Sequence, residues 1–470
     1  MQLAFIDGEK WLAGQGRAQH FQAHRRRSRW RVEFVWRARG GHEDHLSQLQ
    51  LLERLASQDE MGVMDRIERA AVYADALQRP HYHRKKRDVP ACARRKRDLE
   101  VRHFMKTDQL GQLLLTGVPG TELDADAATL FRSVQPGGYI LFGRNITSAV
   151  QLRKLIDDLR DLSDVEPIIT IDQEGGRVSR LRLIGNEPPS AQQLREKDDV
   201  TLVQEHGRIT GRLLRLFGFN LDLCPVLDIS FDDEADNSLR GRCYGKGVAQ
   251  VVRLAGAFND ALRQAGIASC GKHFPGYSAA QVDAHHDLPR IDRSLAELEA
   301  NELAVFRQMA ARVDSMMICH GWYPSFEREK LPASFSARIV TQLLRDDLKF
   351  EGLVMTDDLD MGAIYNEYGL DETIRLALGA GNDLAMICHR VDAIGQAREA
   401  IATVPAAHVN AALENVARFK SRISPPDSFS EAAFRQLDNE VWKLRVAVLG
   451  EERAAERSPE DGKRSPVETY

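Results

Sequence analysis

Residues 248–273, VAQVVRLAGAFNDALRQAGIASCGKH, contain the unit from which the fold can be worked out. The first part, residues 248–265, has apolar residues at the spacing of an amphipathic helix. The last part, residues 267–273, is a short apolar run that ends in Lys272 and His273, as in a buried strand with polar groups at its end. A helix that leads directly into a strand is the repeating unit of a parallel sheet.

The same alternation of strand-length and helix-length segments recurs along most of the chain. The strand-like runs are residues 112–118, 138–142, 167–172, 219–228, 267–273, 315–320, 352–357 and 383–388. The helix-like segments are residues 149–162, 203–217, 248–265, 295–311, 337–348 and 372–378. Eight such units in roughly 290 residues favour an α/β fold, a (β/α)8 barrel of the TIM type in a single catalytic domain. A doubly wound open sheet is the alternative.

The barrel interpretation predicts that functional groups collect where strands end and the following loops begin. Five of the strand-like runs do end in polar residues. These residues are Asp172, Asp228, Lys272 with His273, His320 and Asp357. The apolar pattern alone does not require this placement, so we expect these side chains to line one polar ligand site.

The composition is that of an ordinary globular protein, with 43% hydrophobic and 28% charged residues among 470. No apolar run approaches the roughly 18 residues of a membrane span, and the N-terminus lacks the layout of a secretory signal. Cys224, Cys270, Cys319 and Cys388 lie at wide spacing in apolar runs. This indicates reduced core thiols and a cytoplasmic location, with no metal or organic cofactor implied.

The net charge of −5 divides unevenly, with about +8 in residues 1–104 and about −13 in the remainder. Basic runs lie at residues 25–27, 84–87 and 94–97, and only residues 45–78 have helical spacing. One interpretation is a basic arm for nucleic acid or an anionic surface. The favoured interpretation is an extension that is disordered or poorly folded, or that is not naturally translated, in which case Met105 is the natural start. We expect the catalytic barrel at residues 105–425 and a helical segment with a polar tail at residues 426–470.

Asp357 and Asp358 directly follow an apolar strand-like run. One carboxylate is expected to face the barrel mouth and the other a loop or a helix N-terminus. Both could instead cap the next helix, which is a common role of aspartate. A carboxylate that attacks the anomeric carbon of a sugar must be held rigidly at such a strand end, which favours a nucleophile here.

Asp283 and His285 are two residues apart, so in an extended loop they project to the same side. The carboxylate can then accept the ring N–H of His285, fix its tautomer and raise its basicity. This arrangement suits a proton donor and acceptor and needs no serine or cysteine nucleophile. The alternative is a surface turn with incidental polar residues.

Residues 172–178, DQEGGRV, place a strand-end carboxylate close to an arginine. The phosphate-binding patterns GxGxxG and GxxxxGK are absent, so a nucleotide site is disfavoured. Asp172 is suited to hydrogen bonding of sugar hydroxyls, and Arg177 is either a ligand contact or the ion partner of Asp172.

Six motifs, taken in their order along the chain, resemble glycoside hydrolase family 3. They are DQEGGRV from residue 172, GRCYG from 241, KHFPG from 272, DAH from 283, PAS from 332 and TDDLDM from 356. The resemblance covers about residues 108–425 and is to the single-barrel β-N-acetylglucosaminidases (β-N-acetylhexosaminidases) of bacterial peptidoglycan recycling. It implies hydrolysis of terminal non-reducing β-linked N-acetylglucosamine from a muropeptide or disaccharide. It also implies that the second α/β sandwich domain of longer family members is absent.

Carried over by position, the resemblance implies that Asp357 is the nucleophile and that His285, oriented by Asp283, is the general acid/base. The expected sugar-binding residues are Asp172, Arg177, Arg242, Lys272, His273 and His320. An imidazole that titrates near neutral pH can serve both half-reactions of a retaining mechanism.

The chain departs from the family pattern beside the expected acid/base. Tyr277 and Ser278 stand where the family commonly has His-Gly, and Ala284 stands where it has serine. A serine restricts the backbone more than a glycine, which bears on loop closure. The alternatives are a phosphorylase or a β-glucosidase and, from another class, a nucleic-acid-binding protein with a vestigial barrel. The intact dyad and Asp357 argue against the last of these.

Overall fold

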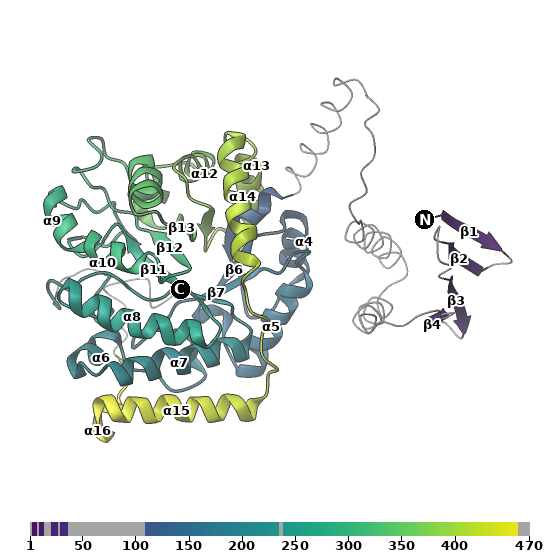
Figure 1. Ribbon diagram of the computed structural model, residues 1–470, viewed down its shortest axis with the longest axis horizontal. Helices are drawn as coiled ribbons and strands as arrows, with labels where there is room; N and C mark the ends of the chain where they lie inside the picture. Colours follow the sequence, from purple (N-terminus) through teal and green to yellow (C-terminus); the bar gives the residue numbers. More distant parts are fainter. Residues whose placement is uncertain are drawn as a thin grey trace, which may run out of the picture. The chain divides into compact units, whose positions relative to one another are not determined.

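The computed structural model describes four strands within residues 2–35, together with residues 109–234 and 238–458 (Figure 1). The chain divides into two compact units, Met1–Ala91 and Cys92–Tyr470. In the first unit two antiparallel hairpins form, β1 (Gln2–Ile6) with β2 (Glu9–Ala13) and β3 (His20–Arg26) with β4 (Arg29–Val35). The helix predicted at residues 45–78 and the basic runs at residues 84–87 and 94–97 lie outside the described residues.

The second unit contains a closed barrel of eight parallel strands, which confirms the predicted fold class. In order around the barrel the strands are β5 (Leu114–Gly117), β6 (Gly138–Leu141), β7 (Ile168–Ile171), β10 (Leu221–Asp222), β11 (Ala268–Phe274), β12 (Ser315–Ile318), β13 (Leu353–Asp358) and β14 (Leu384–Ile387). Each predicted strand-like run overlaps one of them. Residues 219–228 contain only the two-residue strand β10, so most of that run is irregular.

Helices surround the barrel strands (Figure 1). The predicted helical segments contain or overlap α5 (Ala149–Asp161), α7 (Val200–Phe217), α8 (Val248–Gln264), α9 (Leu295–Ala300), α10 (Glu302–Met309), the π-helical segment η5 (Arg338–Asp347) and α12 (Leu370–Gly379). Residues 295–311 form two helices instead of one, because Asn301 has a non-helical backbone. The prediction omitted α4 (Ala125–Val134), α6 (Ala191–Lys197), α11 (Gly362–Tyr365), α13 (Ile394–Ile401) and α14 (Ala406–Lys420).

Local sequence signals account for several helix ends. The N-terminus of α5 is closed by a capping box, in which the Ser148 hydroxyl accepts the N–H of Gln151 and the Gln151 side chain returns to the Ser148 backbone. Helix α7 ends at Phe217, and the next residue, Gly218, takes a left-handed conformation (φ 98°) that glycine tolerates without strain. Every residue of β6 and β12 is buried, as expected for a parallel sheet that helices cover.

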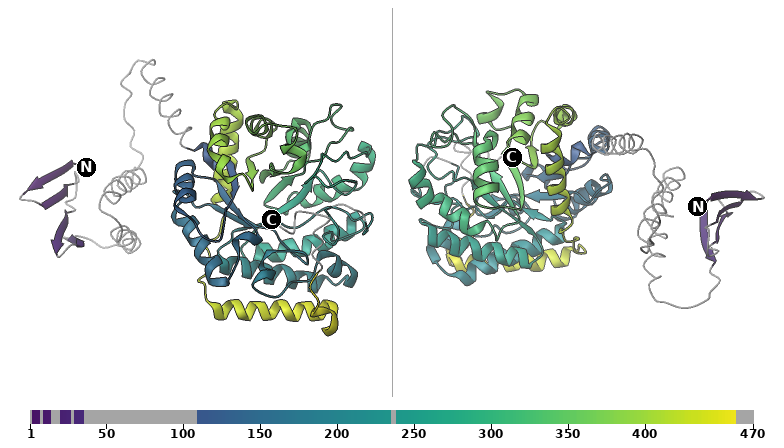
Figure 2. Two further views of the ribbon diagram at one scale, coloured as in Figure 1. Left: turned by 180° about the vertical axis from the view of Figure 1, so that it is seen from behind. Right: turned by 45° about the horizontal axis from the view of Figure 1, so that its top comes forward.

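The helix α15 (Glu431–Leu449) follows the barrel and packs against α7 (Figures 1 and 2). Its apolar face joins the same core as the barrel through Phe434, Leu437, Val441, Leu444 and Val448. Arg445 Nη1 lies 3.1 Å from Glu187 Oε1, and both side chains are buried. A buried ion pair of this kind holds α15 to the loop that precedes α6. Among the described residues no helix is long and apolar enough to cross a membrane.

A short hairpin that the sequence did not indicate follows β7. Its strands are β8 (Gln173–Gly175) and β9 (Val178–Ser179), and they pair antiparallel. Gly175 (φ 102°) and Gly176 (φ 56°) form the turn in conformations that other residues rarely adopt. The double glycine therefore serves to reverse the chain directly after the barrel strand.

The imidazole of His206 in α7 lies beneath this hairpin. A Cβ on Gly175 would come within 3.0 Å of the His206 ring, and the ring centroids of His206 and Phe258 are 5.1 Å apart. Neither ring nitrogen has a hydrogen-bond partner among the residues that the structure describes. Burial lowers the pKa of His206 to about 3, so the ring is neutral in the folded protein at neutral pH.

This histidine predicts a specific dependence of stability on pH. Its folded-state pKa is below the ordinary value of about 6.5, so stability is intact above pH 6.5 and is lost progressively as the pH falls toward 3. Replacement by leucine (His206→Leu) removes this titration. Between pH 7.5 and pH 5, urea denaturation should show the parent losing about 2 kcal/mol more free energy of unfolding than the variant. An equal loss in both proteins would contradict the assignment.

Candidate active site

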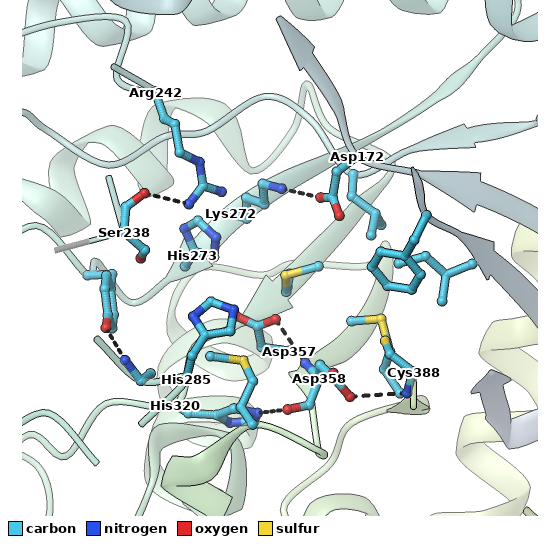
Figure 3. A pocket seen from close by; sticks show the side chains of 18 of the residues that line it. Asp172, Ser238, Arg242, Lys272, His273, His285, His320, Asp357, Asp358 and Cys388 are labelled. Carbon is cyan, nitrogen blue, oxygen red and sulfur yellow. Dashed lines mark hydrogen bonds and ion pairs between the residues drawn. The ribbon is translucent and has the colours of Figure 1, made fainter. Parts of the chain in front are cut away.

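A cavity at the carboxyl ends of the barrel strands brings the predicted polar residues together (Figure 3). The expected site residues that line it are Asp172, Arg242, Lys272, His273, His285, His320 and Asp357. Phe142, Met317 and Met386 contribute an apolar part of the wall. A pocket with a few convergent polar groups on an apolar wall is suited to a small polar ligand such as a sugar.

Lys272 is at the centre of a buried ion network. Its Nζ lies 2.6 Å from Asp172 Oδ1 and 2.7 Å from Glu174 Oε1. The guanidinium of Arg242 binds both oxygens of Glu174, at 2.8 Å from Nε and 2.7 Å from Nη2. The Lys272 side chain is only 2% exposed and that of Glu174 only 5%, so each buried charge depends on its opposite partner.

The pKa values of this network follow from burial and charge together. Burial alone would raise the pKa of Glu174, but Arg242 and Lys272 hold it far below its usual value. Burial would lower the pKa of Lys272, but Asp172 and Glu174 outweigh this effect and raise it. Asp222 behaves differently, because burial raises the pKa of its carboxyl group well above the usual value. Within the network, Lys272 pairs with both Asp172 and Glu174, and Arg242 pairs with Glu174.

The arginine beside Asp172 is Arg180 instead of Arg177. Arg180 Nη2 lies 3.8 Å from Asp172 Oδ2. Arg177 donates from Nε to the carbonyl oxygen of Arg240 (3.1 Å) and from Nη2 to that of Ser238 (2.7 Å), and it is not among the cavity residues. The chain reverses direction in the β8–β9 hairpin. Arg180, which follows the hairpin, therefore lies near the end of β7 again, whereas Arg177 lies in the turn.

The imidazole of His273 is oriented by the fully buried carboxylate of Asp228. Oδ2 of this carboxylate lies 2.7 Å from His273 Nδ1, and Oδ1 accepts the backbone N–H of Tyr277 at 2.7 Å. A carboxylate accepts hydrogen bonds, so Nδ1 carries the proton and Nε2 is the ring nitrogen for a ligand. The register between β11 and β12 shifts between Gly271 and Phe274. Because of this irregularity, the consecutive side chains of Lys272 and His273 can both face the cavity.

Asp357 and Asp358 both line the cavity because the pairing of β13 with β14 shifts at this point. Oδ1 of Asp358 accepts the backbone N–H groups of Cys388 (3.1 Å) and Asp360 (3.0 Å), so this carboxylate joins two strand ends. Burial alone would raise the pKa of Asp357, but the nearby His273 and then His320 hold it below its usual value. Asp357 is therefore an ionised carboxylate at the strand end.

His320 is fully buried and supports the end of β13. Its Nε2 lies 2.9 Å from the backbone oxygen of Asp358, and its Nδ1 lies 2.9 Å from the hydroxyl of Ser334. A carbonyl oxygen only accepts, so Nε2 carries the proton and Nδ1 accepts the serine hydroxyl. Burial lowers the pKa of His320 although Asp357 opposes it. The ring is therefore a neutral link between strand ends β12 and β13.

The predicted contact between Asp283 and His285 is present. Both residues lie in the loop between β11 and α9, residues 275–294, which we term the dyad loop. Asp283 Oδ1 lies 2.6 Å from His285 Nδ1 and also accepts the backbone N–H of His285 at 3.0 Å. Burial would raise the pKa of Asp283, but its bonds to His285 keep it below its usual value. An ionised Asp283 fixes the tautomer in which Nε2 exchanges protons.

Three residues of the site had no individual role predicted from the sequence: Glu174, Arg180 and Asp228. Glu174 belongs to the motif at residues 172–178, and Asp228 is one of the polar strand ends, so both had a positional signal. Arg180 had none. Among the residues that the structure describes, no group of three or more histidine, cysteine or acidic side chains could hold a metal ion.

Comparisons with known proteins match the barrel and its motifs. The profile of the glycosyl hydrolase family 3 N terminal domain matches residues 105–419. A β-hexosaminidase of Pseudomonas aeruginosa is 33% identical over 277 residues, which span 59% of this chain and 82% of that protein. One from Neisseria gonorrhoeae is 35% identical over 277 residues, 57% of this chain and 75% of that protein.

Comparison with solved structures points to the same family. A glycoside hydrolase family 3 β-N-acetylglucosaminidase from Paenibacillus sp. str. FPU-7 has a TM-score of 0.67 at 32% identity, over 72% of this chain and 68% of that one. NagZ from Neisseria gonorrhoeae has a TM-score of 0.62 at 30% identity, over 71% of this chain and 97% of that one. This chain is thus a glycosidase, and it belongs to glycosyl hydrolase family 3.

Proposed function

We propose that this protein removes terminal non-reducing β-linked N-acetylglucosamine and retains the configuration at the anomeric carbon. The observation that carries the proposal is the pairing of Asp357 with His285 in one cavity, the first as an ionised strand-end carboxylate and the second as a carboxylate-oriented imidazole. Relatives named β-hexosaminidase and β-N-acetylglucosaminidase support this choice of sugar.

In the first step the Asp357 carboxylate attacks the anomeric carbon while His285 Nε2 gives a proton to the leaving oxygen. The glycosidic bond breaks and an ester between the sugar and Asp357 forms. In the second step a water molecule attacks the ester while His285 takes a proton from it. The sugar leaves with its original configuration and both residues return to their starting protonation states.

A histidine in the second role differs from the two carboxylates of most retaining glycosidases. The Asp283 carboxylate accepts the Nδ1 proton and stabilises the imidazolium that forms when Nε2 is protonated. An imidazole can give and take a proton near neutral pH without a large shift in its pKa. One residue can therefore serve both half-reactions.

The sugar hydroxyls are assigned to the ion network and to His273. Asp172 is 15% exposed, whereas Glu174 is only 5% exposed. Asp172 is thus the carboxylate that a sugar hydroxyl can reach, and Glu174 holds the cations in place. Lys272 and Arg242 line the cavity as hydrogen-bond donors to sugar oxygens. Arg177 acts indirectly, through the backbone of the segment that leads to Arg242.

We further propose that the substrate is a peptidoglycan fragment, a muropeptide or disaccharide, and that the protein acts in the cytoplasm. The similarity to NagZ and to bacterial β-hexosaminidases supports the substrate. Five cysteines among the described residues are free and buried, which fits a reducing compartment.

The sugar preference can be tested with two aryl glycosides that share one leaving group. We expect kcat/KM for the N-acetylglucosaminide to exceed that for the glucoside by at least about 100-fold, because a site built around one substituent rejects the analogue that lacks it. A preference for the glucoside would overturn the proposed sugar.

Exchanging each member of the aspartate pair for asparagine separates their roles. Asp357→Asn should lower kcat on the aryl N-acetylglucosaminide by about 10⁴-fold or more, because no nucleophile remains. Asp358→Asn retains an oxygen that can accept the N–H groups of Cys388 and Asp360. It should lose no more than about 100-fold. A greater loss in Asp358→Asn than in Asp357→Asn would reverse the assignment.

A further inference from the structure

The side chain of Tyr277 ties the dyad loop together from inside. Its hydroxyl accepts the backbone N–H of Ala284 at 2.8 Å and donates to the backbone carbonyl of Val282 at 3.0 Å. Ala284 is the residue between Asp283 and His285. The phenol therefore holds the chain at the catalytic pair itself.

The other end of this residue is anchored on the sugar-binding side of the cavity. The N–H of Tyr277 donates to Asp228 Oδ1 at 2.7 Å, and the same carboxylate orients His273. The next residue, Ser278, accepts the backbone N–H of Ile229 on its hydroxyl at 2.9 Å. Tyr277 is 4% exposed. It forms a buried bridge from the strand ends to the dyad.

The dyad loop is also held from the side of the nucleophile. The N–H groups of Gly362 and Ala363, at the start of α11, donate to the carbonyl oxygens of His285 and Ala284, each at 3.0 Å. A Cβ at Gly362 would lie 2.5 Å from the carbonyl oxygen of His286, so this close contact requires glycine. The dyad is thus fastened both to the strand end that carries Asp357 and to the Tyr277 hydroxyl.

The loop reaches solvent at Val282, which is 45% exposed, whereas Asp283 and Ala284 are only 8% and 2% exposed. Without the phenolic hydroxyl, the N–H of Ala284 and the carbonyl of Val282 would lose these bonds, and water could replace them only if the loop moved outward. A loop segment that is held by few hydrogen bonds shifts its docked population when one of them is removed.

The Tyr277 hydroxyl is not itself a proton donor to substrate. Backbone groups occupy it on both sides, and burial raises its pKa well above the usual value, so the phenol keeps its proton. Its effect on catalysis has to pass through the residues that it holds.

We infer that Tyr277 is a positioning residue for the general acid/base, because its hydroxyl keeps the Asp283–His285 dyad docked at the cavity. The inference rests on the proposed role of His285. Replacement by phenylalanine keeps the ring and removes both hydrogen bonds. The variant then has the acid in place for a smaller fraction of the time.

The test compares two substrates that share one sugar and differ in leaving group. The 4-nitrophenolate of an aryl N-acetylglucosaminide leaves without a proton, whereas the sugar alkoxide of N,N′-diacetylchitobiose needs one. The value of kcat/KM is measured for the parent, Tyr277→Phe, His285→Ala and the double variant. The matched control is Tyr139→Phe, a buried tyrosine whose hydroxyl is 3.4 Å from Ser163 Oγ outside the cavity.

Tyr277→Phe should lower kcat/KM for the disaccharide about 10- to 100-fold, as two lost hydrogen bonds imply, and for the aryl glycoside less than about threefold. In the His285→Ala background the same substitution should change the disaccharide value less than about threefold, because residues that act as a unit are not additive. Tyr139→Phe should leave the ratio of the two substrates unchanged.

Two results for Tyr277→Phe would overturn the inference: an equal loss on both substrates, or an undiminished effect in the His285→Ala background. Either would mean that the hydroxyl only stabilises the fold. A changed ratio in Tyr139→Phe would do the same, since the ratio would then report general stability. Failure of the proposed function looks different, because His285→Ala itself would then affect both substrates equally.

Discussion

The carboxylate of Glu174, buried between Arg242 and Lys272, is the interaction on which the rest of the site depends. Lys272 also forms an ion pair with Asp172, so charged groups from three separate segments of the chain form one network. Removing one partner of a buried ion pair leaves an uncompensated charge and costs about 3–5 kcal/mol. These segments therefore cannot move independently, and the sugar-binding side of the cavity is rigid.

The proton donor is built on a different principle. His285 lies on a loop that returns to the barrel through hydrogen bonds from Tyr277 and from the start of α11. Such bonds contribute less than buried charges, so this side can open more readily. The two sides meet at Asp228, whose carboxylate binds both His273 and the backbone of Tyr277. The same strand ends therefore position both the acid/base and the sugar.

Much of this arrangement could be predicted from the sequence, because parallel strands bring their carboxyl ends together. The apolar runs located all eight barrel strands, and the i, i+2 spacing located the contact between Asp283 and His285. The remainder depends on local irregularities that apolar patterns do not encode. The β8–β9 hairpin puts Arg180, and not Arg177, beside Asp172. Register shifts in β11 and β13 bring consecutive side chains to one cavity. Glu174 could not be assigned a partner, because Arg242 and Lys272 are distant in the sequence.

The central claim is that Asp357 forms a covalent bond with the sugar. It is tested most directly with a fluorinated N-acetylglucosaminyl fluoride, which forms the glycosyl-enzyme faster than water removes it, followed by mass spectrometry of the digested protein. The account predicts one added sugar on the peptide that contains Asp357, and none in Asp357→Asn. A sugar attached to another residue, or turnover with inverted configuration and no attached sugar, would contradict it.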